Sequence, residues 1–169
     1  MFLKVAMKSK IEEKQKLFAE IRKHMKNSDI AKECLKEKKI GLWIFDAFPL
    51  DFDDIDVTAK TVNGTIYLNP KVLKMDFNIV MRYVIHEFVH VLQHINEEKN
   101  GDKKSDKDQE YLDRDDEIEA FQKQIKFDAK VRGPKAAEKY VDELLEFHDI
   151  KDKKEKKTKK NLLLGEVID

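Results

Sequence analysis

The chain has 169 residues, of which 40% are charged, and its 34 basic and 34 acidic residues leave no formal net charge. This length suits one domain with a hydrophobic core, and the charge balance does not favour nucleic acid as a partner. No apolar run approaches the ~20 residues of a membrane span, and the N-terminus becomes charged too soon for a signal peptide. Cys34 is the single cysteine, so we expect no internal disulfide and a cytoplasmic protein.

The first part of the chain predicts two helices, a strand and an acidic turn. Apolar residues recur with a helical period over residues 8–24, and Ser28 can cap a second helix over residues 30–38. The apolar run at residues 40–45 favours a strand. Four aspartates then lie within residues 51–56. They lack the glycine and the final glutamate of an EF-hand loop, so we expect a solvated turn rather than a calcium site.

The middle of the chain predicts a hairpin followed by a long helix. Asn63-Gly64 separates two β-rich runs within residues 57–68, which is a strong short-range hairpin signal. Pro70 can begin a short helical turn after the second strand. Residues 77–95 are mostly apolar with a helical period, so we expect this helix to run through the core.

The string HEFVH, at residues 86–90, lies inside this helical run. His86 and His90 are four residues apart, so both lie on one helix face and can bind a single zinc ion. Glu87 is adjacent and is suited to act as a general base on water whose pKa zinc has lowered to roughly 7. Buried imidazole and carboxylate groups are costly without partners or metal. The pattern therefore favours a zinc peptidase over a core helix with ordinary hydrogen bonds.

A catalytic zinc ion usually has a third protein ligand. His94 is excluded, because eight helical residues place it about 12 Å from His86 along the axis. Residues 116–121 begin another apolar-periodic stretch, which can form an antiparallel helix and bring a carboxylate to the histidines. Glu117 and Glu119 would point about 200° apart around that helix, so they cannot both face one ion.

HEFVH followed by the sequence EIEA, at residues 117–120, resembles the gluzincins, whose second zinc helix carries Glu-x-x-Ala or Glu-x-x-Ser. The resemblance covers residues 57–132, and the size and layout are most similar to the minigluzincins and to related peptidases of phages and mobile elements. It implies that Zn²⁺ is bound by His86, His90 and Glu117, with Glu119 as the second choice of ligand.

Phe121 departs from the family pattern, since many gluzincins have an aspartate at this position to orient the first histidine. Three nearby aspartates are candidates to replace it: Asp113, Asp115 and Asp116. The donor that would stabilise the oxyanion is left open among three residues that flank the predicted site: Tyr111, Tyr140 and His148.

The resemblance also implies a fold and a mode of substrate binding. The expected fold class is α+β and mostly helical, with a small antiparallel or mixed sheet whose edge hairpin packs on the zinc-binding helix and a second, glutamate-bearing helix. In gluzincins an extended peptide lies along the edge strand before the zinc helix. The residues expected to pair with it here are Thr65, Ile66, Tyr67 and Leu68.

The C-terminal part predicts one more helix, at residues 135–148, and then a tail. Seven lysines within residues 151–160 favour a solvated linker over a patch for an anionic partner, and an apolar segment follows. We expect a single domain at residues 1–150, with its core at 40–132, and a linker and tail at 151–169. The tail can bury itself on the chain's own surface, in a second copy through self-association, or in the active-site cleft as an inhibitor.

The sequence therefore predicts a zinc-dependent endopeptidase that acts on a peptide or protein, with no nucleic acid or membrane as partner. The alternative is a silent or self-inhibited zincin-like interaction or regulatory protein, or a peptidase dedicated to one partner such as a repressor. The presence of Glu87 favours the enzyme, because a purely structural zinc site needs no base beside its first ligand.

Overall fold

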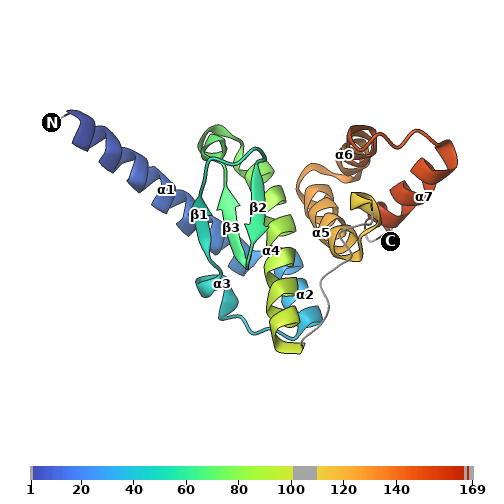
Figure 1. Cartoon of the computed structure of the whole chain (residues 1–169), viewed down its shortest axis with the longest axis horizontal. Coiled ribbons are helices and arrows are strands. Elements are labelled where there is room, and N and C mark those ends of the chain that lie inside the picture. The colour runs from blue at the N-terminus through green and yellow to red at the C-terminus, as the bar shows by residue number, and fades with distance from the viewer. Residues whose placement is uncertain (1, 101–109, 166, 168–169) are drawn as a thin grey trace.

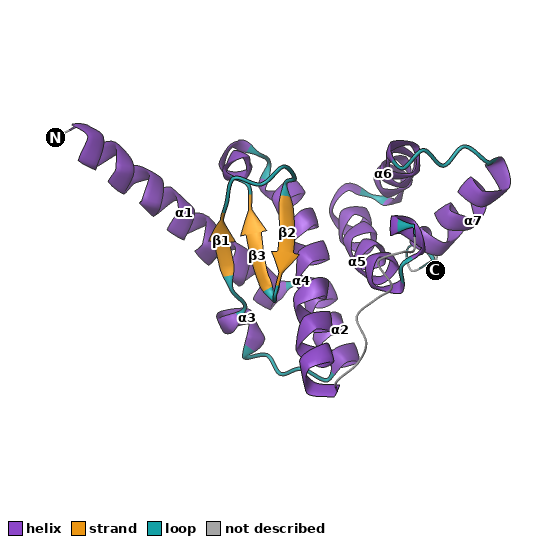
Figure 2. Cartoon of the chain, viewed as in Figure 1, coloured by secondary structure: helices purple, strands orange, loops and turns teal. Residues whose placement is uncertain are grey.

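The structure, a computed structural model, describes residues 2–100, 110–165 and 167, which form two groups of elements side by side (Figure 1). The first group contains a small sheet and the helices around it, and the second is helical. The predicted class, α+β and mostly helical, is confirmed (Figure 2). The first group comprises α1 (Phe2–Asn27), α2 (Asp29–Lys38), α3 (Ile44–Ala47), β1 (Leu50–Phe52), β2 (Ala59–Val62), β3 (Thr65–Leu68), the 3-10 helix η1 (Pro70–Lys74) and α4 (Phe77–Asn100). The second comprises the 3-10 helix η2 (Tyr111–Asp113), α5 (Asp115–Arg132), α6 (Pro134–Phe147) and α7 (Lys153–Leu164).

The two N-terminal helices form where the sequence predicts them. Ser28 caps α2, because its Oγ accepts a hydrogen bond from the backbone N–H of Ala31 at 3.2 Å. The helix ends at Lys39, which adopts a left-handed conformation with φ of 54°. Met25 of α1 and Leu35 of α2 are buried in the same core, so the two helices pack through their apolar sides.

The prediction of a strand at residues 40–45 is wrong, because the chain forms the short helix α3 in this region instead. Ile44, Phe45 and Phe48 are all buried, at a spacing that fits one side of a helical turn. A short apolar run does not by itself distinguish a buried strand from a buried helix. The first strand begins only after Pro49, at Leu50.

The predicted hairpin is confirmed, and its turn uses Asn63 and Gly64, whose φ angles of 49° and 77° are those that a tight primed turn requires. The sheet order is β1-β3-β2, with β1 parallel and β2 antiparallel to β3. The hairpin thus places β2 at the edge of the sheet and β3 in its centre. Helix α4 packs against both strands.

The central position of β3 contradicts the expected peptide-binding strand. Thr65, Ile66, Tyr67 and Leu68 pair with β1 on one side and with β2 on the other, so their backbone groups are already engaged. Ile66 and Leu68 are also fully buried. The strand nearest α4 in the sequence, β3, is therefore not a free edge. The edge strand that packs against α4 is β2.

Buried apolar side chains form two clusters rather than one. The first joins α1–α4 and the sheet, and the second joins α5–α7. Helix α5 belongs to both, since Ala120 and Phe127 lie in the first cluster while Phe121 and Ile125 lie in the second. The boundary between the clusters therefore runs along α5. Of the predicted ligands, His86 and His90 lie on α4, and Glu117 lies on α5 itself.

The segment predicted as a solvated linker is a helix in the structure. Asp152 caps α7 by accepting from the backbone N–H of Glu155 at 2.8 Å. Leu163 and Leu164 are each 2% exposed in the second core, and Lys159 forms an ion pair with Asp113. The tail therefore buries itself on the chain's own surface as far as Leu164, while residues 166, 168 and 169 lie outside the described residues.

Helix α4 continues to Asn100, five residues beyond the end at residue 95 that the sequence predicts. Within the described part of the chain, no helix combines the length and apolar character that crossing a membrane requires.

Burial of α7 predicts unequal effects for its three consecutive leucines. Replacing Leu163 or Leu164 by alanine should lower the free energy of unfolding by about 2–5 kcal/mol, because each change leaves a cavity in the second core. Leu162→Ala is the matched control, since Leu162 is 45% exposed. Urea denaturation of the three variants measures this, and equal stabilities would contradict the packing of α7.

Candidate metal centre

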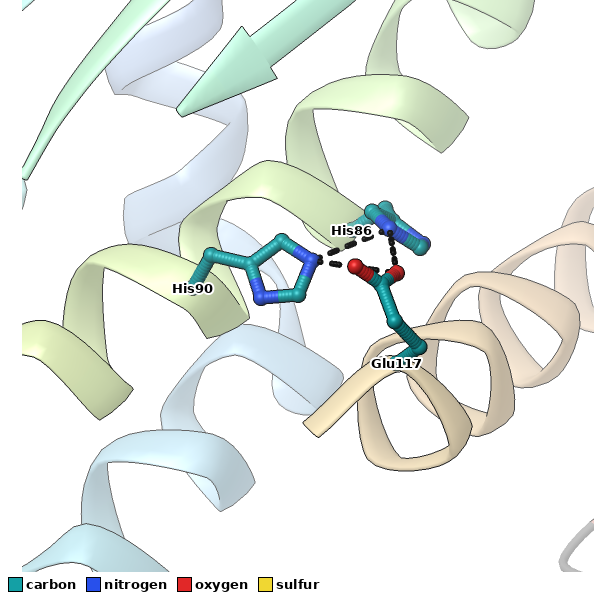
Figure 3. A group of neighbouring side chains, drawn as sticks. All are labelled: His86, His90 and Glu117. Carbon is teal, nitrogen blue, oxygen red and sulfur yellow. Dashed lines mark hydrogen bonds and ion pairs between the residues drawn. The ribbon is translucent and has the colours of Figure 1, made fainter. Parts of the chain in front are cut away.

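Three side chains from two helices converge at the boundary of the two cores. His86 and His90 project from α4, and Glu117 projects from the first turn of α5 (Figure 3). Glu117 Oε2 lies 3.2 Å from His86 Nε2 and 3.4 Å from His90 Nε2, and the two Nε2 atoms are 3.2 Å apart. All three offer one ligand atom within 4.8 Å of the others, so the group can hold a metal ion.

The predicted triad is the one group of this kind among the described residues. His94 lies one turn further along α4 and contacts Glu98 instead, at 3.3 Å. Glu119, the second choice of ligand, forms an ion pair with Lys38 at 2.7 Å. The aspartates at residues 51–56 are exposed, and the first of them, Asp51, lies in β1 rather than in a turn.

The donor set of this group fits zinc. Two imidazole nitrogens and one carboxylate oxygen make up the three protein ligands of many catalytic zinc sites, which leave a fourth position open. Arg114 donates to Glu117 Oε1 at 2.5 Å, so only Oε2 faces the histidines. Glu117 therefore presents a single ligand oxygen, although the assignment of zinc over another divalent ion is a proposal.

The buried carboxylate of Glu117 makes a bound positive charge favourable at the triad. Burial alone would raise the pKa of the Glu117 carboxyl, but contacts with His86 and His90 outweigh it and hold that pKa well below its usual range. Burial alone would lower the pKa of His90, but Glu117 outweighs burial and raises the pKa of His90 to about 9. A proton or a metal ion between these groups is thus stabilised.

Glu87 is held beside the triad by the edge strand. Its carboxylate is 9% exposed and lies next to His86 on α4. The hydroxyl oxygen of Thr61, on β2, lies 2.8 Å from Glu87 Oε2 and 3.0 Å from the Glu87 backbone carbonyl. The hydroxyl fixes one carboxylate oxygen of Glu87 and leaves Oε1 available.

The departure at Phe121 has a structural consequence for His86. The Phe121 ring packs edge-on against the His86 imidazole at 4.5 Å, and His86 Nδ1 is buried without a hydrogen-bond partner. None of the expected replacements, Asp113, Asp115 or Asp116, supplies that bond. Aromatic packing by Phe121 therefore stands where the gluzincin pattern would place an orienting carboxylate.

A cleft of about 790 Å³ opens on the His86 and Glu87 side of the triad. Its walls come from the segment before β2, from α4 and from the end of α6, and are largely apolar. A smaller cavity of about 260 Å³ lies on the His90 and Glu117 side and is lined by polar groups that include Arg114 and His94. The triad is therefore reached from both sides.

The three candidate oxyanion donors all line the larger cleft, as predicted. The rings of Tyr111 and His148 stack at 5.3 Å, and the Tyr140 hydroxyl accepts from Gln124 Nε2 at 2.7 Å. Burial raises the pKa of Tyr140 to about 12 and lowers that of His148. The phenol of Tyr140 thus remains a donor near neutral pH.

Three contributors to the site were not identified from the sequence: Thr61, Gln93 and Arg114. Thr61 is a residue of the predicted hairpin, and Arg114 lies three residues before Glu117, which is the spacing of helical neighbours. Gln93 likewise lies three residues after His90, so helical spacing was the available signal for both. The Thr61 contact depends on how α4 and β2 meet, and sequence spacing does not reveal it.

Comparison of the chain with protein-family models, curated proteins and solved structures finds no match.

Replacement of the two glutamates of α5 should separate ligand from neighbour. With saturating zinc, Glu117→Ala should bind far less than one ion per chain, because the carboxylate that faces the histidines is lost. Glu119→Ala should still reach one ion per chain. Elemental analysis after gel filtration measures this, and the opposite order would transfer the ligand role to Glu119.

Zinc binding should strengthen as the pH rises towards about 9. Below the pKa of about 9 the His90 ring carries a proton that a metal ion must displace. Displacement of one proton predicts an apparent affinity that rises about tenfold per pH unit from neutrality and levels off above that pKa. Competition with a chelator of known pH dependence tests this, and a constant affinity would contradict it.

Proposed function

We propose that the chain is a zinc-dependent endopeptidase of the gluzincin kind. In this proposal His86, His90 and Glu117 bind zinc, and Glu87 is the general base. The observation that carries it is the convergence of the three ligand atoms beside a carboxylate that faces an open cleft. Peptide hydrolysis needs this combination of a metal with an open position and a base within reach.

The residues of the site divide the chemistry between them. A zinc ion bound by His86, His90 and Glu117 would supply Lewis-acid chemistry that makes a water molecule easier to deprotonate. Glu87 accepts a proton from the attacking water and returns it to the leaving amine. Thr61 holds Glu87 Oε2 at 2.8 Å, so Oε1 is the oxygen that carries the proton.

The edge strand β2 is the proposed platform for the substrate. Among the described strands it pairs only with β3, so its outer backbone groups can bind an extended peptide. Ala59, at its start, lines the larger cleft, and Thr61 lines the smaller cavity. A peptide along β2 would pass both openings of the triad. The candidates for a side-chain donor to the oxyanion are Tyr111, Tyr140 and His148.

One observation favours a different role for the metal. The triad joins α4, which packs in the first core, to α5, which packs in both, so a bound ion would also help to hold the two groups of elements together. A structural or regulatory zinc site would use the same three ligands but would not depend on Glu87. The role of Glu87 therefore separates the two functions.

Glu87→Gln should keep one zinc ion per chain and lower the rate of casein cleavage by about 10²–10⁴-fold, since the amide keeps the shape and loses the base. Glu98→Gln is the matched control, because Glu98 lies on the same helix with a 69% exposed side chain. Metal content and cleavage of unfolded casein are measured together. An unchanged cleavage rate in zinc-loaded Glu87→Gln would contradict the role of Glu87 as the base. A zinc-loaded wild-type protein that cleaves no casein would support the structural role.

A further inference from the structure

We propose that Gln93 and Glu119 are positioning residues that fix the His90 ring in the tautomer able to bind a metal ion. The inference rests on the proposed role of His90 as a ligand. It gives Glu119 a function other than that of ligand, and it explains why two glutamates lie two residues apart on α5.

The amide of Gln93, three residues after His90 on α4, contacts both His90 and α5. Gln93 Oε1 is 2.7 Å from His90 Nδ1. On its other side, Gln93 Nε2 donates to the backbone carbonyl of Asp116 at 3.0 Å and to Glu119 Oε2 at 2.8 Å. One side chain thus links a proposed ligand on α4 to two groups of α5.

These partners determine which way the amide faces. A carbonyl and a carboxylate only accept hydrogen bonds, so the NH₂ group of Gln93 must be directed at Asp116 and Glu119. The amide oxygen then faces His90. Because this oxygen can only accept, His90 Nδ1 must carry the proton. In the neutral ring the lone pair is therefore on Nε2, which faces Glu117 and His86.

Glu119 is in turn held by a residue of a third helix. Lys38, on α2, lies 2.7 Å from Glu119 Oε1 and 2.9 Å from Oε2. Both side chains are less than one third exposed, so the pair is partly shielded from solvent. The lysine balances the charge of Glu119 and fixes the carboxylate that orients Gln93. The order of support is Lys38, Glu119, Gln93, His90.

The other histidine has no comparable support. His86 Nδ1 is buried without a hydrogen-bond partner in the described structure, and its ring is packed by Phe121. The Gln93 amide thus fixes the tautomer of one of the two imidazoles, that of His90. Loss of a partner that orients a metal-bound histidine typically lowers metal affinity by about 10–100-fold.

Zinc affinity tests this role with a matched control. Gln93→Ala should weaken zinc binding by about 10–100-fold. Gln122→Ala should leave the zinc affinity unchanged. Gln122 is also half-buried and also donates to a backbone carbonyl, but that carbonyl belongs to Leu162 of α7, away from the histidines. Because Glu119 acts through Gln93, adding Glu119→Ala to Gln93→Ala should cause no further loss. Equal affinities for Gln93→Ala and Gln122→Ala would overturn the proposal.

The tautomer itself gives a second readout that does not require metal or activity. Nitrogen-15 NMR of the protein without added metal, at a pH where both rings are neutral, should show His90 protonated at Nδ1. This form should give way to a mixture in Gln93→Ala and persist in Gln122→Ala. A His90 tautomer that is unchanged in Gln93→Ala would overturn the proposal. A wild-type protein that binds no zinc would refute the proposed function and leave this measurement decisive for Gln93.

Discussion

The cost of burying the Glu117 carboxylate is the constraint on which the site depends. Glu117 is 5% exposed, and a charged carboxylate in such a place is unfavourable unless cationic or donor groups surround it. Arg114 binds one of its oxygens, and the two histidines face the other. Each of these groups stabilises the charged form, so the cavity between them favours a positive charge. A metal ion held by these side chains would supply that charge.

The position of Glu117 depends on how α5 is held against the first group of elements. Ion pairs with α2 follow α5 along its length. Lys123, 2% exposed, contacts Glu33 at 2.8 Å and Glu37 at 2.9 Å, and Lys130 contacts Asp29 at 2.7 Å. Contacts with Lys123, and with Lys126 beside it, lower the pKa of Glu33 to about 2. The Lys123–Glu33 pair is partly buried. The exposed outer pair contributes little.

Local sequence patterns predicted the parts of this protein that depend on nearby residues. The HEFVH helix, the Asn63-Gly64 hairpin and the Ser28 cap each depend on neighbours within a few residues, and each is confirmed. The grouping of His86, His90 and Glu117 followed from helical spacing and family resemblance. The failures concern long-range packing: which strand is central, whether residues 40–45 form a strand, and where the lysine-rich segment lies. The lysines of α7 face solvent or acidic partners while Leu163 and Leu164 are buried, so composition concealed an amphipathic helix.

The spacing of the α5 residues links the position of the metal-binding group to the packing of α5 against α4. Ala120 is fully buried in the first core, one turn after Glu117, and its small side chain permits α5 to approach α4 closely. Glu117 and Glu119 then point to different sides of that contact, one towards the histidine Nε2 atoms and the other towards Gln93 and Lys38. A residue larger than alanine at the crossing would move both carboxylates together. The short sequence EIEA therefore places a proposed ligand, a close helix contact and the proposed support for His90 within a single turn of helix.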